Sequence, residues 1–266
     1  MNHLLRSLAP ISDEGWGLLD DEAKQRSMVG LAARKLVDFS GPLGWEHSAV
    51  NLGRATPLTS SPADGVAAKQ RRVLPLVELR ADFDVAFSEI QDIDRGARDV
   101  DLAALDRAAR QIAVAENKAV FHGWQDVMKG IADSSPHQAS PLGKSGEAYP
   151  ARVAGAVQLL LQSGVGGPYG LALGPDQYRL VAETAEHGGY PLFEHLAKIL
   201  DGPIVWSPGV NGAVVVSLRG GDFRLESGQD LSLGYDSHDG TRVNLYLEES
   251  FTFYVVTPEA AVLLPA

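Results

Sequence analysis

The sequence predicts an elongated α+β protein that carries a separate α/β subdomain. Three patterns predict this class. Apolar and polar residues alternate from Val77 to Phe87, as they do in a half-buried strand. Apolar residues recur at helical spacing over 102–120, and a helix of about 20 residues is a rod roughly 30 Å long. After residue 134, helix-like and strand-like segments alternate, as they do in α/β units.

The N-terminal part predicts a helix followed by a short strand. The hydroxyl of Ser12 is a suitable N-cap, and the acids at 13–14 lie near the positive end of the helix dipole. Apolar residues then recur at helical spacing up to the basic pair at 34–35, where cations are favoured. Residues 36–39 have the composition of a strand, and the Gly–Pro turn at 41–44 closes it.

Residues 51–73 predict a long hairpin with few apolar side chains. Two polar arms flank the turn-forming cluster at 60–65. A two-stranded hairpin is only marginally stable alone in water. We therefore expect it to gain support from another surface, plausibly that of a neighbouring subunit.

The strand from Val77 is followed by the long helix, which begins after a cap at Asp99 or Asp101. Gly123 suits the position just beyond the end of this helix. The Ser, Pro and Gly-rich stretch 134–146 indicates a boundary. Beyond it we expect helices at 151–163, 176–185 and 192–200, strands at 171–173, 204–206 and 213–218, and a loop at 186–191. The alternating strands around 243–255 are expected to return to the long helix.

Composition limits the functional classes. The 266 residues include 34 acidic and 23 basic ones, a net charge of −11, which weighs against general nucleic-acid binding. The chain has no cysteine, so disulfides, thiolate metal sites and cysteine nucleophiles are excluded. No apolar run is long enough to span a bilayer, and the first residues lack the apolar stretch of a signal peptide. We therefore expect a cytoplasmic protein.

Glycine-rich segments offer no convincing phosphate site. Gly143–Ser145 resembles the end of a phosphate-binding loop, but Gln138 stands where the first glycine of that motif is needed. The glycines at 164–170 miss the dinucleotide pattern because Tyr169 replaces the last one, and they follow a helix rather than a strand. Both segments are interpreted as connections.

Candidate catalytic side chains are equally weak, so we predict no catalytic residue, no metal site and no cofactor. Ser237 and His238 lie next to acids, but a triad is built in space, and turn chemistry explains this segment better. His187 and His195 lack the spacing of metal ligands on one helix. Glu116 lies close to the apolar stripe of the long helix, and we expect it to pair with an arginine.

Short motifs along the whole chain resemble those of family 1 encapsulins. They are Leu5–Pro10 with Trp16, Arg34–Asp38, Gly41–Trp45, Leu76–Arg80, Asp94–Gly96, Gly167–Tyr169, Arg219–Phe223, Gly228–Tyr235 and Glu249–Phe253.

This resemblance implies an HK97-type fold like that of tailed-phage capsid proteins. Residues 1–50, 74–134 and 222–266 would form the peripheral domain, 51–73 the extended loop and 135–221 the axial domain. The hairpin would then pair with a neighbouring copy. Contacts of this head-to-tail kind form a closed shell when the rotations that relate neighbouring subunits return to the first subunit. The smallest icosahedral shell (T=1) has about 60 copies.

The resemblance also implies a function: a self-assembling, non-enzymatic shell that encloses a cargo enzyme, typically a peroxidase or a ferritin-like iron oxidase. The cargo would be captured by a short targeting peptide in an apolar groove with a charged rim. The matching positions are Met28, Leu31, Arg34, Leu36, Asp38, Leu231 and Leu233. The alternative is that the apolar members are ordinary core. The family often has an aromatic residue near 27–28, where this chain has Ser27 and Met28.

Two further positions carry family expectations. The loop that rims the five-fold pore would comprise Glu186, His187, Gly188, Gly189 and Tyr190, and His187 would make the pore charge depend on pH. Some members bind a flavin near an aromatic residue, but Ser88 stands here although Tyr190 and Arg80 are present, so no flavin is predicted. The alternative functions are a phage major capsid protein and a stand-alone hydrolase that uses Ser237 and His238.

Overall fold

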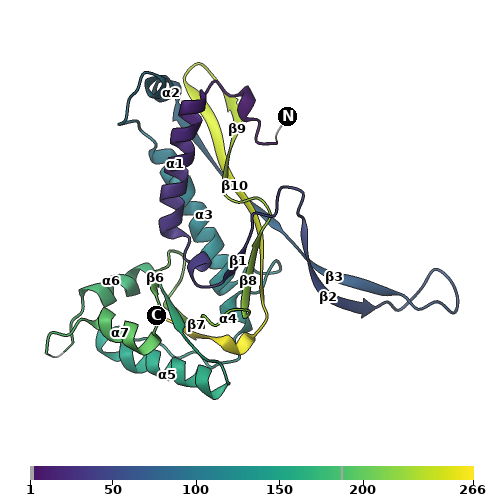
Figure 1. The fold of residues 1–266 in the computed structure, drawn as a ribbon, viewed down its shortest axis with the longest axis vertical. Helices are drawn as coiled ribbons and strands as arrows, with labels where there is room; N and C mark the ends of the chain where they lie inside the picture. Colours follow the sequence, from purple (N-terminus) through teal and green to yellow (C-terminus); the bar gives the residue numbers. More distant parts are fainter. Residues whose placement is uncertain (1–2, 187) are drawn as a thin grey trace.

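The computed structural model describes residues 3–186 and 188–266. In this part of the chain two β-sheets, each covered by helices, stack along one long axis, and a two-stranded hairpin projects sideways from their junction (Figure 1). The α+β class predicted from the sequence is confirmed.

The first sheet has the strand order β1-β8-β10-β4, with β9 also paired to β10. Its strands are β1 (Asp38–Ser40), β4 (Val77–Ala86), β8 (Phe223–Ser227), β9 (Ser232–His238) and β10 (Arg242–Val255). The long strand β10 pairs antiparallel with β4 from Arg242 to Phe251, and with β8 from Phe251 to Val255. The alternation noted in the sequence therefore marks β4, and β10 is the strand that joins the sheet together.

Two long helices cover one face of this sheet: α1 (Asp13–Gly30) and α3 (Ala103–His122). Trp16, Leu19 and Leu105 are buried in the core that they form with strands β4, β9 and β10. The Ser12 hydroxyl accepts a hydrogen bond from the Gly15 N–H at 3.0 Å, which confirms the predicted cap. A helix that was not predicted, α2 (Phe87–Asp94), follows β4, and short 3-10 turns occur at Arg6–Leu8 and Ala33–Lys35.

The helix α1 is shorter than the sequence pattern predicts. It ends at Gly30, whereas the basic pair Arg34 and Lys35 lies in the following 3-10 turn. At Gly30 the backbone comes so close to α3 that an added Cβ would lie 2.9 Å from the Cβ of Ala113. The strand after the turn is also shorter than expected, since β1 begins at Asp38 rather than at Leu36.

Asn117 of α3 holds the end of α1 in place. Its side-chain oxygen accepts hydrogen bonds from the N–H groups of Ala32 and Ala33 at 3.1 and 3.0 Å. Its amide group donates to the carbonyl oxygens of Gly30 and Pro208 at 2.7 and 2.9 Å. One fully buried side chain therefore satisfies four backbone groups in two separate segments.

Replacing Asn117 with alanine should lower the free energy of unfolding by about 2 to 3 kcal/mol, because buried backbone groups would lose their partners. Chemical denaturation measures this loss. The matched control is Gln111→Ala, which changes an exposed residue of the same helix and should leave stability almost unchanged. Equal stability of both variants would contradict the role given to Asn117.

The second sheet has the order β11-β7-β5-β6. Its strands are β5 (Tyr169–Leu173), β6 (Ile204–Trp206), β7 (Ala213–Ser217) and β11 (Ala261–Leu264), and its helices are α5 (Tyr149–Gln162), α6 (Pro175–Glu183) and α7 (Leu192–Leu200). Two small helical segments, α4 (Ile131–Ser134) and Gly146–Ala148, connect it to α3, and a turn at Pro258–Ala260 precedes β11. Every residue of β5 and β7 is buried, as expected for central strands.

The last strand differs from the expectation for the C-terminal segment. Residues 222–266 were assigned together to the domain of the long helix, and β8, β9 and β10 do lie there. Strand β11, however, pairs antiparallel with β7 over 261–264 and so belongs to the second sheet. The C-terminal segment therefore ties the two sheets together, and the remaining domain boundaries stay a prediction.

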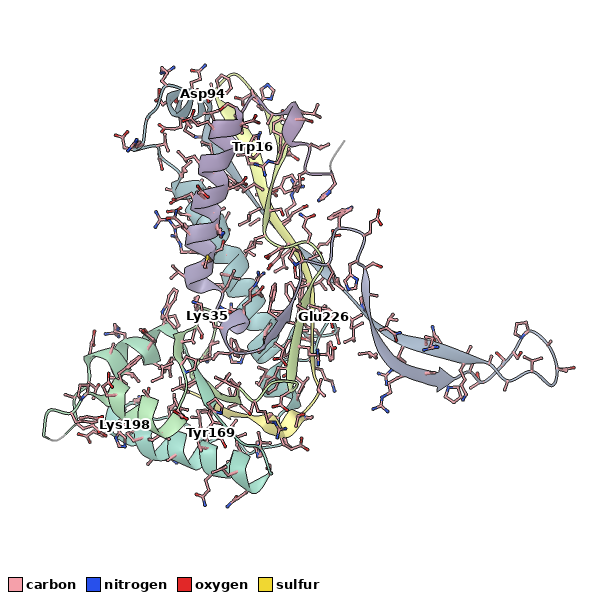
Figure 2. The ribbon with its side chains drawn as sticks, in the orientation of Figure 1. Trp16, Lys35, Asp94, Tyr169, Lys198 and Glu226 are labelled. Atoms are coloured by element: carbon pink, nitrogen blue, oxygen red, sulfur yellow. The ribbon has the colours of Figure 1, made fainter. Side chains whose placement is uncertain are left out.

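The projecting hairpin consists of β2 (Ala49–Pro57) and β3 (Lys69–Pro75). Within the described residues these strands pair only with one another, and almost all of their side chains are exposed. Figure 2 shows polar side chains along both arms, away from the rest of the molecule. The hairpin predicted at 51–73 is thus present, and Val50 at its base is its buried anchor.

Candidate functional site

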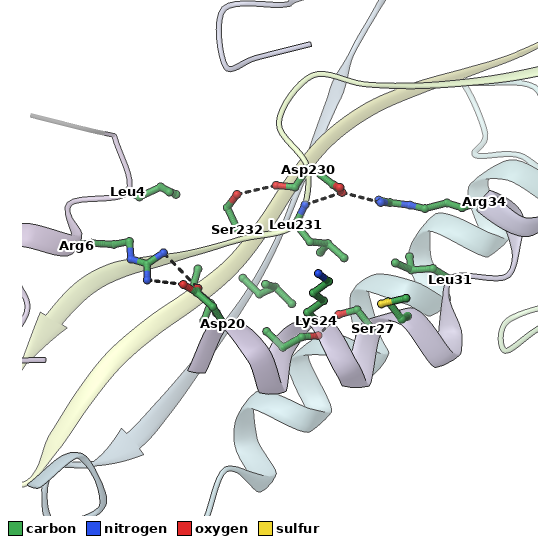
Figure 3. A pocket seen from close by; sticks show the side chains of 14 residues that line it. Leu4, Arg6, Asp20, Lys24, Ser27, Leu31, Arg34, Asp230, Leu231 and Ser232 are labelled. Carbon is green, nitrogen blue, oxygen red and sulfur yellow. Dashed lines mark hydrogen bonds and ion pairs between the residues drawn. The ribbon is translucent and has the colours of Figure 1, made fainter. Parts of the chain in front are cut away.

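A groove of about 530 Å³ lies between helix α1 and strand β9 (Figure 3). Residues 230–233 at the start of β9 and Leu247 of the paired strand β10 border it, and Leu4 and Arg6 close one end. Five of the seven side chains that the resemblance assigned to a peptide dock line this groove: Met28, Leu31, Arg34, Leu231 and Leu233.

The five side chains differ in how they face the groove. Met28 is 58% exposed and Leu231 is half-buried, so both present apolar surface to a ligand. Leu31 and Leu233 are buried and form the floor. Leu31 and Leu233 are therefore partly core residues, as the alternative interpretation expected. Met28 is not a core residue.

The other two predicted residues, Leu36 and Asp38, do not line the groove. The 3-10 turn at Ala33–Lys35 redirects the chain toward the second sheet. Leu36 is 2% exposed, and its Cδ2 lies where a side chain at Gly170 would have to fit. The Asp38 carboxylate accepts a hydrogen bond from the Gly221 N–H at 2.6 Å. Both residues therefore hold the turn at the junction of the two sheets.

Sequence reasoning missed the N-terminal wall of the groove. The Leu4 carbonyl accepts a hydrogen bond from the Tyr235 N–H of β9 at 2.9 Å. Arg6 forms an ion pair with Asp20 of α1 at 2.7 Å, and its guanidinium lies 4.1 Å from the centre of the Trp16 ring. The motif Leu5–Pro10 was noticed only for its resemblance. A segment without periodicity gives no signal of the strand that it packs against.

Arg34 lies at the opposite end of the groove and is shared by three carboxylates. It contacts Glu116 of α3 at 2.7 Å, Glu249 of β10 at 2.7 Å and Asp230 at 2.6 Å. Burial alone would lower the pKa of Arg34, but the three carboxylates outweigh it and raise that pKa. The expectation that Glu116 pairs with an arginine is confirmed. Asp230 is the member of this cluster that faces the groove (Figure 3).

The loop assigned to a pore lies between α6 and α7. His187 is outside the described residues, so its expected pH sensitivity stays a prediction. The carboxylate of Glu186 contacts Nδ1 of His195 at 2.8 Å, and the Tyr190 ring lies 5.0 Å from Nζ of Lys198. Gly188 and Gly189 both have positive φ, at 97° and 80°, which glycine adopts without strain.

The geometry around Ser237 and His238 gives the hydrolase alternative no support. The Ser237 hydroxyl donates a hydrogen bond to Asp236 at 3.0 Å. Nδ1 of His238 contacts the Tyr235 hydroxyl at 2.5 Å, and in the described residues no hydrogen bond joins the His238 ring to Ser237. Asp239 accepts hydrogen bonds from the N–H groups of Thr241 and Arg242, so the predicted turn begins at Asp239, whereas Ser237 and His238 belong to strand β9.

The three residues considered for a flavin site do not lie together. Arg80 lies on the first sheet with its guanidinium 3.8 Å from the Tyr246 ring, whereas Tyr190 precedes α7 beside the second sheet, and Ser88 is in the first turn of α2. The absence of a flavin stays a prediction. In residues 3–186 and 188–266, no group of three or more histidine, aspartate or glutamate side chains is arranged so that it could hold a metal ion. In the same ranges, no helix combines the length and apolarity needed to cross a membrane.

Comparison with known proteins decides the family. Residues 1–252 match the model of a family described as encapsulating protein for peroxidase. The type 1 encapsulin shell protein of Rhodospirillum rubrum is 46% identical over 270 residues, which cover 99% of this chain and 96% of that protein. The chain belongs to the type 1 encapsulin shell protein family. The shell proteins of Rhodococcus erythropolis (42% identical, 99% and 100% covered) and Mycobacterium tuberculosis (39%, 99% and 99%) agree with this.

Solved structures confirm the fold that the resemblance implied. A virus-like particle from Pyrococcus furiosus matches 94% of this chain and 98% of its own with a TM-score of 0.67 and 20% identity. The capsid of Myoviridae phage XM1 matches 89% of this chain and 92% of its own with a TM-score of 0.56 and 12% identity. At such identities the likeness shows the HK97-type fold alone. The sequence therefore places this chain with the encapsulins, and the phage capsids share its architecture.

Proposed function

We propose that this chain assembles into a closed icosahedral shell of about 60 copies that encloses a cargo enzyme bound through a short peptide. The observation that carries the assembly is the β2–β3 hairpin, whose strands find no third strand in the described residues. Exposed strand edges invite pairing with another chain. Membership of the encapsulin family supports a copy of the same chain as that partner.

A second exposed surface lies at the base of the hairpin and suits the same assembly. Trp124 and Val127 are 40% and 46% exposed and border a cleft with Leu52 and Leu74 of the hairpin. Exposed apolar side chains gathered in one place are typical of protein interfaces. A neighbouring copy seated there would cover them.

The groove beside α1 supports the capture of an extended peptide. On its side away from β10, strand β9 pairs with no other strand in the described residues; the Leu4 carbonyl takes the Tyr235 N–H, and the rest of this edge is open to an added strand. Met28 and Leu231 offer apolar surface for spaced side chains. We propose a peroxidase as the cargo, because the description of the matching family names a peroxidase as the encapsulated protein. A ferritin-like iron oxidase is the other candidate. A cytoplasmic location is proposed with it, in keeping with a chain that has no cysteine.

Electron microscopy and light scattering of the purified protein test the assembly directly. Uniform hollow particles with the mass of about 60 chains are expected. A folded species of a single chain, 28.4 kDa, at micromolar concentration would contradict the proposal.

Replacing Met28 with glutamate should leave the particles intact and reduce cargo loading by about tenfold or more, because a charge would enter the apolar groove. Co-expression with a peroxidase that carries its terminal peptide, followed by measurement of enzyme per particle, checks this. Val29→Glu is the matched control: Val29 is 62% exposed, neighbours Met28 and does not line the groove. Equal loading of both variants would place the peptide elsewhere.

A further inference from the structure

Behind the groove, carboxylates outnumber the cation that they surround. Glu116 is fully buried and Glu249 is 2% exposed, and both contact the same guanidinium, that of Arg34. Asp230 contacts Arg34 as well. One cation therefore faces three carboxylates, so the cluster would carry a net charge of −2 if every member were ionised. Keeping two neighbouring carboxylates ionised and away from water costs more free energy than one cation offsets.

The hydrogen bonds leave one oxygen of each glutamate without a donor. Arg34 donates to Oε2 of Glu116 at 2.8 Å and to Oε2 of Glu249 at 2.7 Å. The Oε1 atoms of both carboxylates are buried and receive no hydrogen bond from any described residue. The Oε2 atoms of the two glutamates lie 2.7 Å from the same Nη2 atom of Arg34, so the two carboxyl groups are immediate neighbours. A proton held between them would supply a donor that the surrounding residues do not.

We propose that Glu116 and Glu249 share one proton, and that this pair positions Arg34 and Asp230 at the end of the groove. The shared proton reduces the charge of the cluster from −2 to −1. Such pairs occur where two carboxyl groups occupy one site, and the two then titrate as a unit. Arg34 and Asp230 are the other charged groups whose fields act on the pair in the described part of the chain.

The electrostatics of the cluster agree with this geometry. Burial raises the pKa of Glu249 well above its ordinary value of 4.5, and the neighbouring charge of Glu116 raises that pKa further. Burial also raises the pKa of Glu116, although Arg34 opposes the shift. The pair therefore gives up its shared proton only above the ordinary glutamate pKa.

Loss of the proton should disturb the groove. A second negative charge behind Arg34 would draw its guanidinium inward and weaken its contact with Asp230. Asp230 also accepts a hydrogen bond from the N–H of Leu231 at 2.8 Å, so a shift of Asp230 moves an apolar wall of the groove. Peptide binding would thus depend on pH, and this consequence rests on the proposed function.

Infrared spectroscopy of the purified particles tests the shared proton without any peptide. Near neutral pH, the wild-type protein should show the carbonyl stretch of a neutral carboxylic acid, and Glu249→Gln should lose it. The glutamine amide still donates to Glu116, so this variant should fold. Glu248→Gln is the matched control on the opposite face of β10, and it should keep the band. A wild-type spectrum without that band, or a Glu249→Gln spectrum that retains it, would overturn the proposal.

The pH profile supplies a second readout. The pair's stabilising contribution is fully present below 4.5, the ordinary glutamate pKa, and is lost as the pH rises through the raised pKa. Relative to wild type, Glu249→Gln should therefore gain thermal stability as the pH rises. Peptide affinity should fall by about tenfold in wild type as the pH rises through the raised pKa of the pair and stay nearly constant in Glu249→Gln. Parallel profiles of wild type and variant would contradict the shared proton, whereas absence of peptide binding at every pH would contradict only the groove's proposed function.

Discussion

A chain in which a short Gly–Ser linker replaces residues 55–70 is expected to fold normally and to remain a single copy in solution. Almost every side chain in this segment is exposed, and none is buried. The buried anchor Val50 lies outside it. The deletion therefore removes nothing from either hydrophobic core, so the free energy of unfolding should barely change. What it removes is the outer part of the β2–β3 pair, from Ala55 to Gln70, which has no other strand as a partner in the described residues.

Size-exclusion chromatography with light scattering measures the outcome, and circular dichroism checks the fold. Wild type should elute as a particle, and the deletion variant as a single chain slightly lighter than the full chain of 28.4 kDa. The matched control replaces only the turn 60–65 with glycine and serine at equal length, which leaves both strands β2 and β3 intact. That control should still assemble. Particles of wild-type size from the deletion variant would show that other surfaces hold the shell.

Elements whose pattern is local were predicted well. The alternation from Val77 marks β4, and the apolar stripe at 102–120 marks α3. The bounds of α7 and β6 agree with the sequence prediction. In each case the signal lies within a window of a few turns, because side-chain periodicity depends only on the backbone of that element.

Features that depend on distant partners were missed. The pairing of β11 with β7 joins residues about 48 apart, and nothing in the composition of 261–264 names that partner. The early end of α1 depends on its close approach to Ala113 of α3. Leu36 was assigned to the groove by the family resemblance, but a 3-10 turn directs it to the other sheet, where it lies against Gly170.

The burial of Glu249 was not predicted, although the sequence pattern of its strand indicates it. In β10, the odd-numbered positions from Val243 to Val255 face the core, and Glu249 has that parity. A strict period of two would have placed its carboxylate on the buried face. A buried acid requires a partner. Arg34 is 215 residues away in sequence, so the need for a cation could be predicted from the sequence, whereas its identity could not.

Replacing Arg34 with methionine should cost about 3 to 5 kcal/mol of stability at neutral pH, because it leaves buried carboxylates without their cation. The methionine keeps much of the volume that packs 4.7 Å from the Phe39 ring, so the loss reports on charge. The matched control is Arg26→Met, which removes the ion pairs of an exposed arginine of α1 with Glu22 of the same helix and Asp106 of α3, and which should cost far less.

The pH dependence of the Arg34→Met variant distinguishes charge from packing. Below the ordinary glutamate pKa of 4.5, Glu116 and Glu249 are neutral in the folded and unfolded states alike, so the missing cation matters little there. The penalty should grow as the pH rises, since the folded variant must either hold extra protons or bury two unpaired charges. Denaturant unfolding at a series of pH values measures this growth. A penalty that is the same at every pH would mean that Arg34 stabilises the fold through packing, and that the carboxylates around it do not depend on its charge.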